Sequence, residues 1–413
     1  MTFKNWPTFE QITCAYRACR LGKRASVHQT RFEAHLGKNL IELHGELLSG
    51  KYKPSPVVCF VVTHPRPREI FAAHFRDRIV HHLVVGELTP MWERKFIHSS
   101  FACRNGRGTH GALKYLQNAV RKISQGGIRP VYALQLDLAS FFVTIHRPTL
   151  CHLLTKNLKN ERLKRLVEIL YLTDSRPNAL LKGPKHLFDL IPKEKSWFGQ
   201  SKDQGIPIGN LISQFGANVY LTGLDHLIQR KLKPNAYLRY MDDLILLDTD
   251  PERLRPFEKI IDDWLKAHRR QSLNPAKTRL SRMSEGIDYL GYRCRQGDSP
   301  REPVQFFLEP QKKWEWIQTL KDLAALDFQS TEKPHPLSHH LESEKVNQTL
   351  SRANSRLGYM KHAESFRLRK DSIDRLLRDT NRGRGLPDAP PLELGDPWVP
   401  LKTRRDYLAI RRR

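Results

Sequence analysis

The chain has 413 residues, 39% of them hydrophobic, which is enough for a large folded core and excludes an intrinsically disordered chain. Lysine and arginine total 70 against 43 acidic residues, so the formal net charge is +27, and the excess runs through the whole length. Positive charge spread over a folded chain favours a polyanion bound along an extended groove, so nucleic acid is the expected partner. Charge alone also fits a basic soluble protein of unrelated function.

The cysteines and the apolar runs exclude two further classes. The six cysteines include no C-x-x-C pair, so we expect reduced thiols rather than a zinc site or a disulfide framework. No uninterrupted apolar stretch approaches the ~18 residues needed to span a bilayer, and the first residues lack an apolar signal core. We therefore expect a soluble, cytoplasmic protein without membrane contact.

The N-terminal part of the chain is predicted to begin with helices and to continue with a hairpin. Apolar residues recur at helical spacing over residues 8–50. Strand-like runs follow at 57–62 and 69–72, and the short connection between them places Arg66 and Arg68 at the hairpin tip.

Helices, loops and strands are then predicted to alternate. A glycine- and arginine-rich loop at 99–108 carries Arg104 and Arg107, and a strand at 131–136 leads directly into Asp137. The other expected segments are helices at 75–96, from about 110, and at 147–172, 210–232 and 253–268, a loop at 173–202, basic helices at 310–326 and 341–377, a Pro-rich linker at 385–400 and a basic tail at 402–413.

Two adjacent carboxylates lie at the centre of a second predicted hairpin, over residues 236–248. Tyr240-Met241-Asp242-Asp243 stands between two apolar runs, where a pair of acids is costly to bury unless a cation offsets the desolvation. Asp137 supplies a third carboxylate if the two strands are neighbours, although taken alone it also fits an acidic helix N-cap. Mg²⁺ prefers carboxylate and phosphate oxygens, so these acids predict the two-metal site of a nucleotide polymerase.

Other residues are candidates for contacts to a nucleotide. An aromatic ring at Phe142 would exclude a 2′-hydroxyl and select deoxynucleotides, whereas Phe141 better fits the core. The glycines that follow Gln204, beginning with Gly205, allow the backbone to approach a nucleotide closely. Four arginines can bind phosphate oxygens, although each also fits an ordinary solvated side chain: Arg66, Arg68, Arg104 and Arg107.

The order of these motifs resembles the successive palm motifs of reverse transcriptases. Along the chain they are Leu136-Asp137-Leu138 with Phe141-Phe142, Gln204-Gly205-Ile206-Pro207-Ile208-Gly209, Tyr240-Met241-Asp242-Asp243, Asn274-Pro275-Ala276-Lys277-Thr278 and Tyr289-Leu290-Gly291-Tyr292. The resemblance implies an α+β right-hand polymerase, with fingers, a palm built on an antiparallel sheet, and a helical thumb. It also implies RNA-directed DNA synthesis with two Mg²⁺ ions or Mn²⁺ in their place, an RNA template, dNTP substrates and a cDNA product.

The resemblance assigns roles residue by residue. The catalytic residues are Asp137, Asp242 and Asp243, and Leu138 joins them in the metal set. The residues assigned to nucleotide binding are Arg66, Arg68, Phe142, Gln204, Gly205 and Lys277, the last near the pyrophosphate. The residues assigned to template and primer are Arg104, Arg107, Ser213, Gln214, Tyr240 and Met241, together with Leu290 and Gly291 as the primer grip.

One branch of the family is matched more closely. Residues 208–214, Ile-Gly-Asn-Leu-Ile-Ser-Gln, look like the IGxxxSQ signature of diversity-generating retroelement reverse transcriptases. Bacterial enzymes of the so-called unknown groups, several of them antiphage-defence reverse transcriptases, share much of this pattern. The domains implied are N-terminal helices and fingers at 1–95, a palm at 96–300 with fingers elements up to about 130, a helical thumb at 301–380, and a Pro-rich linker with a basic tail at 381–413, which matches nothing in the family.

The sequence leaves the physiological setting open. One setting is an antiphage-defence system in which a dedicated non-coding RNA is copied into cDNA, and the C-terminal extension slightly favours it because it suggests an added interaction. The other is mutagenic copying of a template repeat in a diversity-generating retroelement. An untemplated or protein-primed nucleotidyl transferase would use the same site, whereas the intact aspartates argue against a catalytically silent RNA-binding protein. An accessory protein or a homo-oligomer is compatible with all of these settings.

Overall fold

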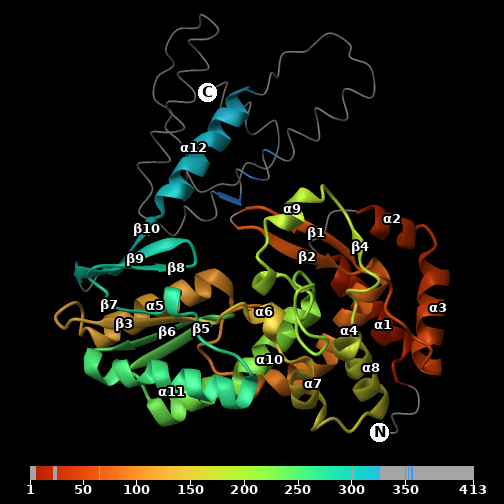
Figure 1. Cartoon of the computed structure of the whole chain (residues 1–413), viewed down its shortest axis with the longest axis horizontal. Coiled ribbons are helices and arrows are strands. Elements are labelled where there is room, and N and C mark those ends of the chain that lie inside the picture. The colour runs from red at the N-terminus through yellow and green to blue at the C-terminus, as the bar shows by residue number, and fades with distance from the viewer. Residues whose placement is uncertain are drawn as a thin grey trace, which may run out of the picture. The chain divides into compact units, whose positions relative to one another are not determined.

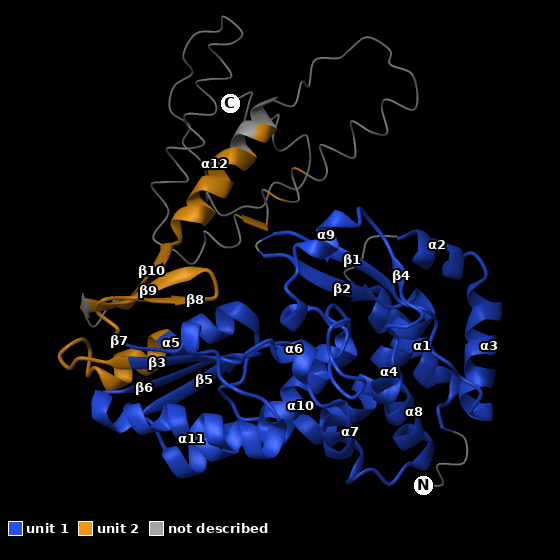
Figure 2. Cartoon of the chain, viewed as in Figure 1, with its two compact units in different colours: residues 1–116, 133–280 blue, residues 117–132, 281–413 orange. Residues whose placement is uncertain are grey.

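The computed structural model describes residues 6–21, 26–64, 66–299, 302–325, 349, 352, 355 and 356. It divides into two compact units, unit 1 with Met1–Leu116 and Ala133–Leu280, and unit 2 with Gln117–Tyr132 and Ser281–Arg413 (Figure 2). The predicted linker and tail at 381–413 lie outside the described residues, as does nearly all of the predicted helix at 341–377. The division into fingers, palm and thumb stays a prediction.

The N-terminal segment of unit 1 is helical, as its periodicity predicts. Helix α1 (Phe9–Arg20) begins at Thr8, whose side chain and that of Gln11 cap each other's backbone N–H groups. Helices α2 (Val27–Glu33) and α3 (Leu36–Ser49) follow, and α3 ends at Gly50 with a φ of 68°. A left-handed residue at this position suits glycine, which carries no Cβ to clash.

A small sheet follows these helices, with its strands in the order β2-β1-β4. Strands β1 (Val58–Val62) and β2 (Arg68–Ala72) form the predicted antiparallel hairpin, and β4 (Leu180–Leu181) pairs in parallel with β1. The prediction of a plain loop at 173–202 is therefore wrong, since this segment contributes β4 and the short helix α9 (His186–Asp189). Both residues of β4 are exposed, so the sequence has no alternation of buried and polar positions that would predict this strand.

A four-stranded sheet brings the two predicted acidic segments together. Its order is β5-β6-β3-β7, with β3 (Tyr132–Asp137) beside β6 (Asp243–Asp248), as Figure 1 shows. Strand β5 (Ala236–Tyr240) pairs antiparallel with β6, which confirms the predicted hairpin, and β7 (Arg279–Arg282) lies on the other side of β3. The acids that end β3 and begin β6 are therefore on adjacent strands.

Helices surround these sheets, and most of their bounds agree with the predicted helical segments to within a few residues. The span predicted as helical at 147–172 forms two helices, Arg147–Thr155 and Glu161–Leu172, and the short helix Phe141–Thr144 was not predicted. Helix α10 packs on α4, α7 and α11, and α11 also packs on β6. The helices that begin in unit 1 are α4 (Phe75–Glu93), α5 (Gly108–Ile123), α6 (Phe141–Thr144), α7 (Arg147–Thr155), α8 (Glu161–Leu172), α10 (Leu211–Leu227), which continues as a π-helical turn over Ile228–Leu232, and α11 (Pro251–Arg269).

Unit 2 contains a second antiparallel sheet and a helix. The sheet has the order β10-β9-β8, formed by β8 (Ile287–Tyr289), β9 (Tyr292–Ser299) and β10 (Glu302–Leu308), and α12 (Pro310–Ala325) follows. Helix α12 confirms the helix predicted at 310–326. Strand β10, which pairs with the strand directly before it, was not predicted from composition. No helix among the described residues is both long and apolar enough to cross a membrane. The six cysteines, all of them among the described residues, form no disulfide.

Candidate active site

The tetrapeptide Tyr240-Met241-Asp242-Asp243, predicted to bind metal, forms the tip of the β5–β6 hairpin. Tyr240 pairs with Asp243, which leaves Met241 and Asp242 as a two-residue loop. Met241 has a φ of 59°, a left-handed conformation that two-residue hairpin loops usually give to glycine or asparagine. This turn leaves Asp242 and Asp243 next to each other and only partly buried.

Asp137 meets these acids from the neighbouring strand. It is 6% exposed, and its negative charge acts on both Asp242 and Asp243. Lys277 donates from Nζ to Asp137 Oδ1 at 2.7 Å, and the backbone N–H of Asn274 donates to the Asp137 carbonyl at 2.8 Å. The structure thus gathers the three predicted catalytic acids and the predicted lysine, and it adds Asn274, which the sequence did not single out.

The surroundings of Asp242 and Asp243 oppose the ionisation of these two acids. Burial, strengthened by the negative charge of Asp137, raises the pKa of Asp242 from 3.8 to about 6. Burial and the charges of Asp242 and Asp137 together raise the pKa of Asp243 from 3.8 to about 7. The positive charge of Lys277 lowers both pKa values, and Arg68 lowers that of Asp242. Carboxylates that repel one another in this way are stabilised by a cation.

The three acids are suitable ligands for a divalent ion whose coordination is completed by the substrate. Within the described ranges, no group of three or more His, Cys, Asp or Glu side chains is arranged so that it could hold a metal ion by itself. Mg²⁺ is usually held by one or two carboxylates together with waters and substrate phosphates, so an open set of three acids is suitable. The side chain of Leu138 is buried, so only its backbone carbonyl could join this set.

The predicted nucleotide residues are joined through backbone hydrogen bonds. Ile206 donates its N–H to the carbonyl of Phe142 at 3.0 Å, and Gly205 donates to that of Ile145 at 2.9 Å. Phe141 is 2% exposed and Phe142 is half-buried, in agreement with core and pocket positions respectively. The candidate steric gate at Phe142 and the Gln204-Gly205 segment therefore form one local structure.

Trp197, which the sequence did not reveal as a site residue, packs against the Gln204-Gly205 segment. Its indole N–H donates to the carbonyl of Gln204 at 2.8 Å, and its backbone N–H donates to Glu69 at 2.8 Å. Gly205 has a φ of 84°, and a Cβ added there would overlap the Trp197 ring. Arg176 lies over the same ring, 5.5 Å from the centroid. The lysine- and proline-rich segment that carries Trp197 gave no periodic signal that could have revealed this contact.

Two predicted nucleic-acid contacts are contradicted by burial. The Arg104 side chain is 4% exposed, and its guanidinium donates to Glu93 at 2.6 Å and to the carbonyls of Ile97 and Ser100 at 2.7 Å. These acceptors hold the guanidinium within the loop, which favours a structural role over a phosphate contact. Ser213 is 1% exposed, so its side chain is too buried to reach a template or primer.

The remaining predicted contacts occupy accessible positions. Arg66 and Arg68 are exposed near the β1–β2 tip, and the charge of Arg68 acts on Asp242. Arg107 lies beside His98, with Nη1 3.1 Å from its Nε2, and the Tyr240 hydroxyl is 3.3 Å from Thr109 Oγ1.

Gln214 is partly exposed on α10, and two predicted primer residues lie in unit 2. Leu290 and Gly291 form the β8–β9 turn of that unit, with φ values of 51° and 85°. Positive φ at both loop positions is the geometry of a tight type I′ hairpin.

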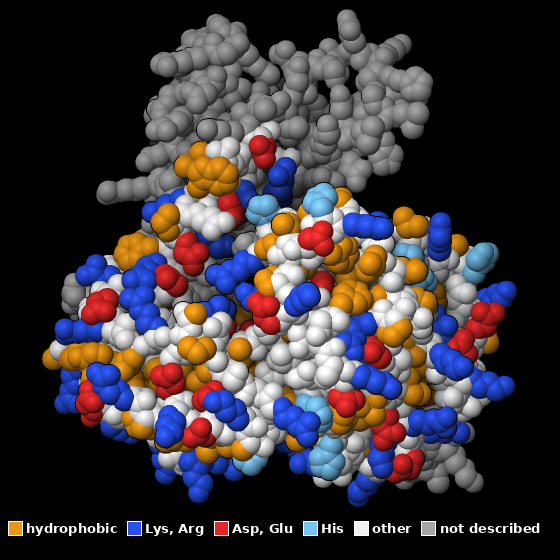
Figure 3. All heavy atoms as spheres, in the orientation of Figure 1, with side chains coloured by type: hydrophobic (Ala, Val, Ile, Leu, Met, Phe, Trp, Pro, Cys, Tyr) orange, Lys and Arg blue, Asp and Glu red, His pale blue; other side chains and the backbone are white. Residues whose placement is uncertain are grey.

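The described surface agrees with the spread of charge in the sequence, because Lys and Arg side chains are distributed over the visible face rather than gathered at one point (Figure 3).

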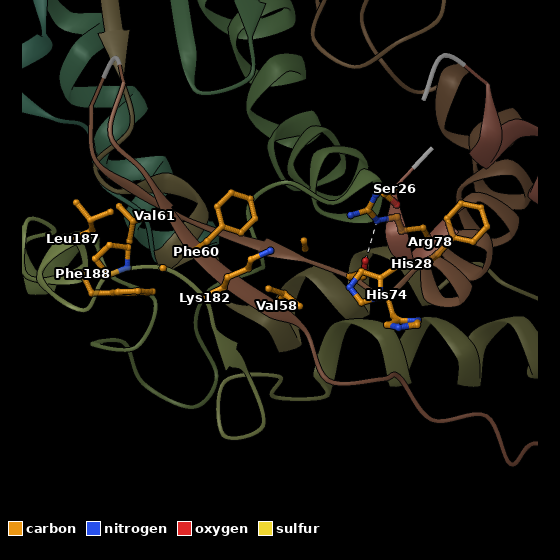
Figure 4. A pocket seen from close by; sticks show the side chains of 15 residues that line it. Ser26, His28, Val58, Phe60, Val61, His74, Arg78, Lys182, Leu187 and Phe188 are labelled. Carbon is orange, nitrogen blue, oxygen red and sulfur yellow. Dashed lines mark hydrogen bonds between the residues drawn. The ribbon is translucent and has the colours of Figure 1, made fainter. Parts of the chain in front are cut away.

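A cavity of about 430 Å³ lies beside the β1–β2 hairpin of unit 1. Figure 4 shows Phe60 and Phe188 on one side of it, with His28, His74 and Arg78 gathered on the other. Arg78 donates from Nε to the carbonyl of Ala73 at 2.9 Å. None of the three catalytic acids lines this cavity, so it is separate from the acidic site.

Three acids lie on neighbouring strands, with two of them at a hairpin tip and a lysine beside the third, which is the arrangement expected for the active site of a nucleic-acid polymerase. The sequence matches the reverse transcriptase (RNA-dependent DNA polymerase) family over residues 61–294, and the chain belongs to that family. It is an RNA-directed DNA polymerase, a nucleotidyltransferase, and membership implies the right-hand polymerase fold. A distant relative is protein YkfC of Escherichia coli (strain K12), 23% identical over 317 residues that cover 68% of this chain and 78% of YkfC. Both findings agree with a prokaryotic reverse transcriptase.

Proposed function

We propose that the chain synthesises cDNA on an RNA template by two-metal nucleotidyl transfer at Asp137, Asp242 and Asp243. In this reaction the primer 3′-oxygen forms a bond to the α-phosphorus of a dNTP and loses its proton, while the bond to pyrophosphate breaks. Two bound Mg²⁺ ions, or Mn²⁺ in their place, would lower the pKa of the primer hydroxyl and neutralise the leaving pyrophosphate. The observation that carries the proposal is the convergence of three acids on neighbouring strands, where burial and the charge of Asp137 raise the pKa values of Asp242 and Asp243.

The surrounding residues supply binding and selection. Lys277, which is 45% exposed at its side chain, can leave Asp137 and pair with the pyrophosphate once cations occupy the acids. Phe142, held next to Gly205 by the backbone bonds of its own segment, would exclude a 2′-hydroxyl from the sugar position. Arg66 and Arg68 stand at an exposed tip from which a guanidinium can bind the triphosphate.

The chemistry is tested by primer extension with purified protein. We expect extension of a DNA or RNA primer on an RNA template with Mg²⁺ and dNTPs, and its loss in the Asp242→Ala, Asp243→Ala double variant. Asp263→Ala, which removes an exposed acid on α11, is the matched control and should retain extension. Robust synthesis by the double variant would contradict the catalytic assignment.

For the physiological setting we propose an antiphage-defence system, in which a dedicated non-coding RNA is copied. The 208–214 segment, which resembles the signature shared by retroelement and defence enzymes, supports this branch, and the 381–413 extension favours defence within it. The alternative setting, mutagenic copying in a diversity-generating retroelement, has the support of the same 208–214 segment.

Sequencing both the copurifying RNA and its DNA product separates these settings. A repeated or concatenated product from one structured RNA is expected for defence. Adenine-directed errors along a template repeat would favour diversity generation instead, and DNA unrelated to any RNA would favour an untemplated or protein-primed transferase.

A further inference from the structure

The arginine that precedes the metal-binding tetrapeptide is completely buried. Arg239, the fourth residue of β5, is 0% exposed, although an arginine is almost never fully buried unless it is paired. Its Nε and Nη2 donate to the two carboxylate oxygens of Asp225 at 2.8 and 2.7 Å. Its Nη1 donates to Asn218 Oδ1 at 3.1 Å and to the carbonyl oxygen of Met241 at 3.0 Å. The guanidinium thus reaches from α10 to the tip of the hairpin.

The acceptor at the hairpin tip is a strained position. Met241 has a φ of 59°, which is uncommon for a residue that carries a Cβ and persists only where the surroundings hold it. Its carbonyl belongs to the peptide bond that immediately precedes Asp242. A donor fixed on that carbonyl therefore fixes the plane of the peptide from which Asp242 projects.

The anchor for this donor is rigid. Asn218 and Asp225 are seven residues apart on α10, hence on one face of the helix, and they are 1% and 0% exposed. Asn218 Nδ2 donates to the carbonyl of Ala102 at 2.8 Å, and the Tyr237 hydroxyl donates to Asp225 at 2.8 Å. Every acceptor of the guanidinium is therefore either held in place by another element or is the Met241 carbonyl itself.

A buried ion pair is a poor means of stabilising a fold, because apolar side chains of similar volume are often at least as stabilising. What an apolar residue at position 239 cannot supply is a directed donor for Met241. We propose that Arg239, braced by Asp225 and Asn218, is a positioning residue that sets the divalent-metal affinity of the hairpin by orienting the Met241-Asp242 peptide. The proposal rests on the metal-binding role given above to Asp242 and Asp243.

The test measures metal binding separately from synthesis. Mn²⁺ binding to the protein alone is followed by electron paramagnetic resonance, together with urea denaturation and the Mg²⁺ dependence of primer extension. Arg239→Lys keeps the charge but loses the fork of donors, and the pair Arg239→Gln with Asp225→Asn leaves no buried charge unpaired. We expect the Mn²⁺ dissociation constant and the half-saturating Mg²⁺ concentration to rise about tenfold in each folded variant, the size typical of lost support behind metal ligands.

A control and a rescue separate positioning from stability. Asp248→Asn weakens the contacts to Arg253 and Asn235 at the far end of β6, away from Arg239, so it should lower stability while leaving Mn²⁺ affinity within twofold of the wild type. Met241→Gly makes the left-handed conformation accessible without support, so adding it to Arg239→Lys should recover at least threefold in Mn²⁺ affinity.

The opposite results overturn the proposal. Wild-type Mn²⁺ affinity in folded Arg239→Lys protein, or no recovery with Met241→Gly, would leave Arg239 with a structural role only. These results differ from those that would overturn the proposed function. If the proposed function is wrong, the wild-type protein binds Mn²⁺ but makes no DNA on an RNA template.

Discussion

Replacing Asp242 with asparagine should stabilise the metal-free protein while it abolishes synthesis. The folded protein holds the Asp242 proton up to a pKa of about 6, whereas the unfolded chain releases it near 3.8. Because the folded state binds more protons between these values, its stability falls as the pH rises through them. A pKa raised by this amount lowers the free energy of unfolding at pH 8 by about 3 kcal/mol. Because Asp242 is partly exposed, we expect a smaller loss of roughly 1–2 kcal/mol.

The assay is urea denaturation of wild type and Asp242→Asn in EDTA, from pH 4 to pH 8. The variant should have a free energy of unfolding higher by roughly 1–2 kcal/mol at pH 8, and the difference should shrink towards zero near pH 4. Saturating Mn²⁺ should stabilise the wild type more than the variant, because a ligand that binds only the folded state stabilises it by mass action.

Asp248, at the other end of β6, provides a control with the opposite sign. Its buried carboxylate accepts from Arg253 Nη1 at 2.9 Å and from Asn235 Nδ2 at 3.2 Å, so Asp248→Asn should lower stability by about 1–3 kcal/mol at pH 8. An Asp242→Asn protein that is less stable than the wild type at pH 8, or whose difference does not depend on pH, would refute the repulsion among the three acids.

Three other substitutions probe the nucleotide side of the site. Phe142→Ala should raise ribonucleotide incorporation about tenfold or more in a competition assay, whereas Phe141→Ala should mainly lower the melting temperature; an unchanged ribonucleotide ratio would remove the gate role. Gly205→Ala should destabilise the protein by about 1–3 kcal/mol through overlap with Trp197, and adding Trp197→Ala should relieve part of that loss in denaturation. Lys277→Met should reduce kcat by about a hundredfold with little change in the KM for primer–template in steady-state extension, and wild-type kcat would contradict its charge-neutralising role.

The convergence of Asp137, Asp242 and Asp243 was predictable because their signals are local. Asp137 ends an apolar strand, and Asp242 and Asp243 interrupt an apolar hairpin, so the cost of burial at each place could be inferred from immediate neighbours in the sequence. Arg104 shows the limit of such signals. Its glycine- and arginine-rich loop fits either a phosphate contact or an internal ion pair, and Glu93, eleven residues earlier, decides between them.

Other contacts were not predictable because their partners are distant along the chain. Trp197 lies in a segment without periodicity, and it contacts Gln204 and Glu69 only because this segment folds back onto the Gln204 loop and strand β2. Arg239 and Asp225 did carry a usable signal, since each is a charged residue inside an apolar element and such a residue requires a partner. The sequence could have indicated that they pair, but not that the guanidinium also reaches the Met241 carbonyl.

Helix α10 explains why buried polar side chains persist in a segment that is otherwise apolar. Before its first turn, Asn210 donates from Nδ2 to the carbonyl of Phe71 at 2.8 Å and accepts from the N–H of Ala73, which ties the helix to β2. Further along, Asn218 and Asp225 hold Arg239 and through it the metal hairpin. Three buried polar groups on one helix add less stability than apolar side chains of the same size would. Their common effect is to fix the hairpin that carries Arg68 and the hairpin that carries Asp242 to one rigid element, so that the proposed triphosphate and metal contacts keep a constant spacing.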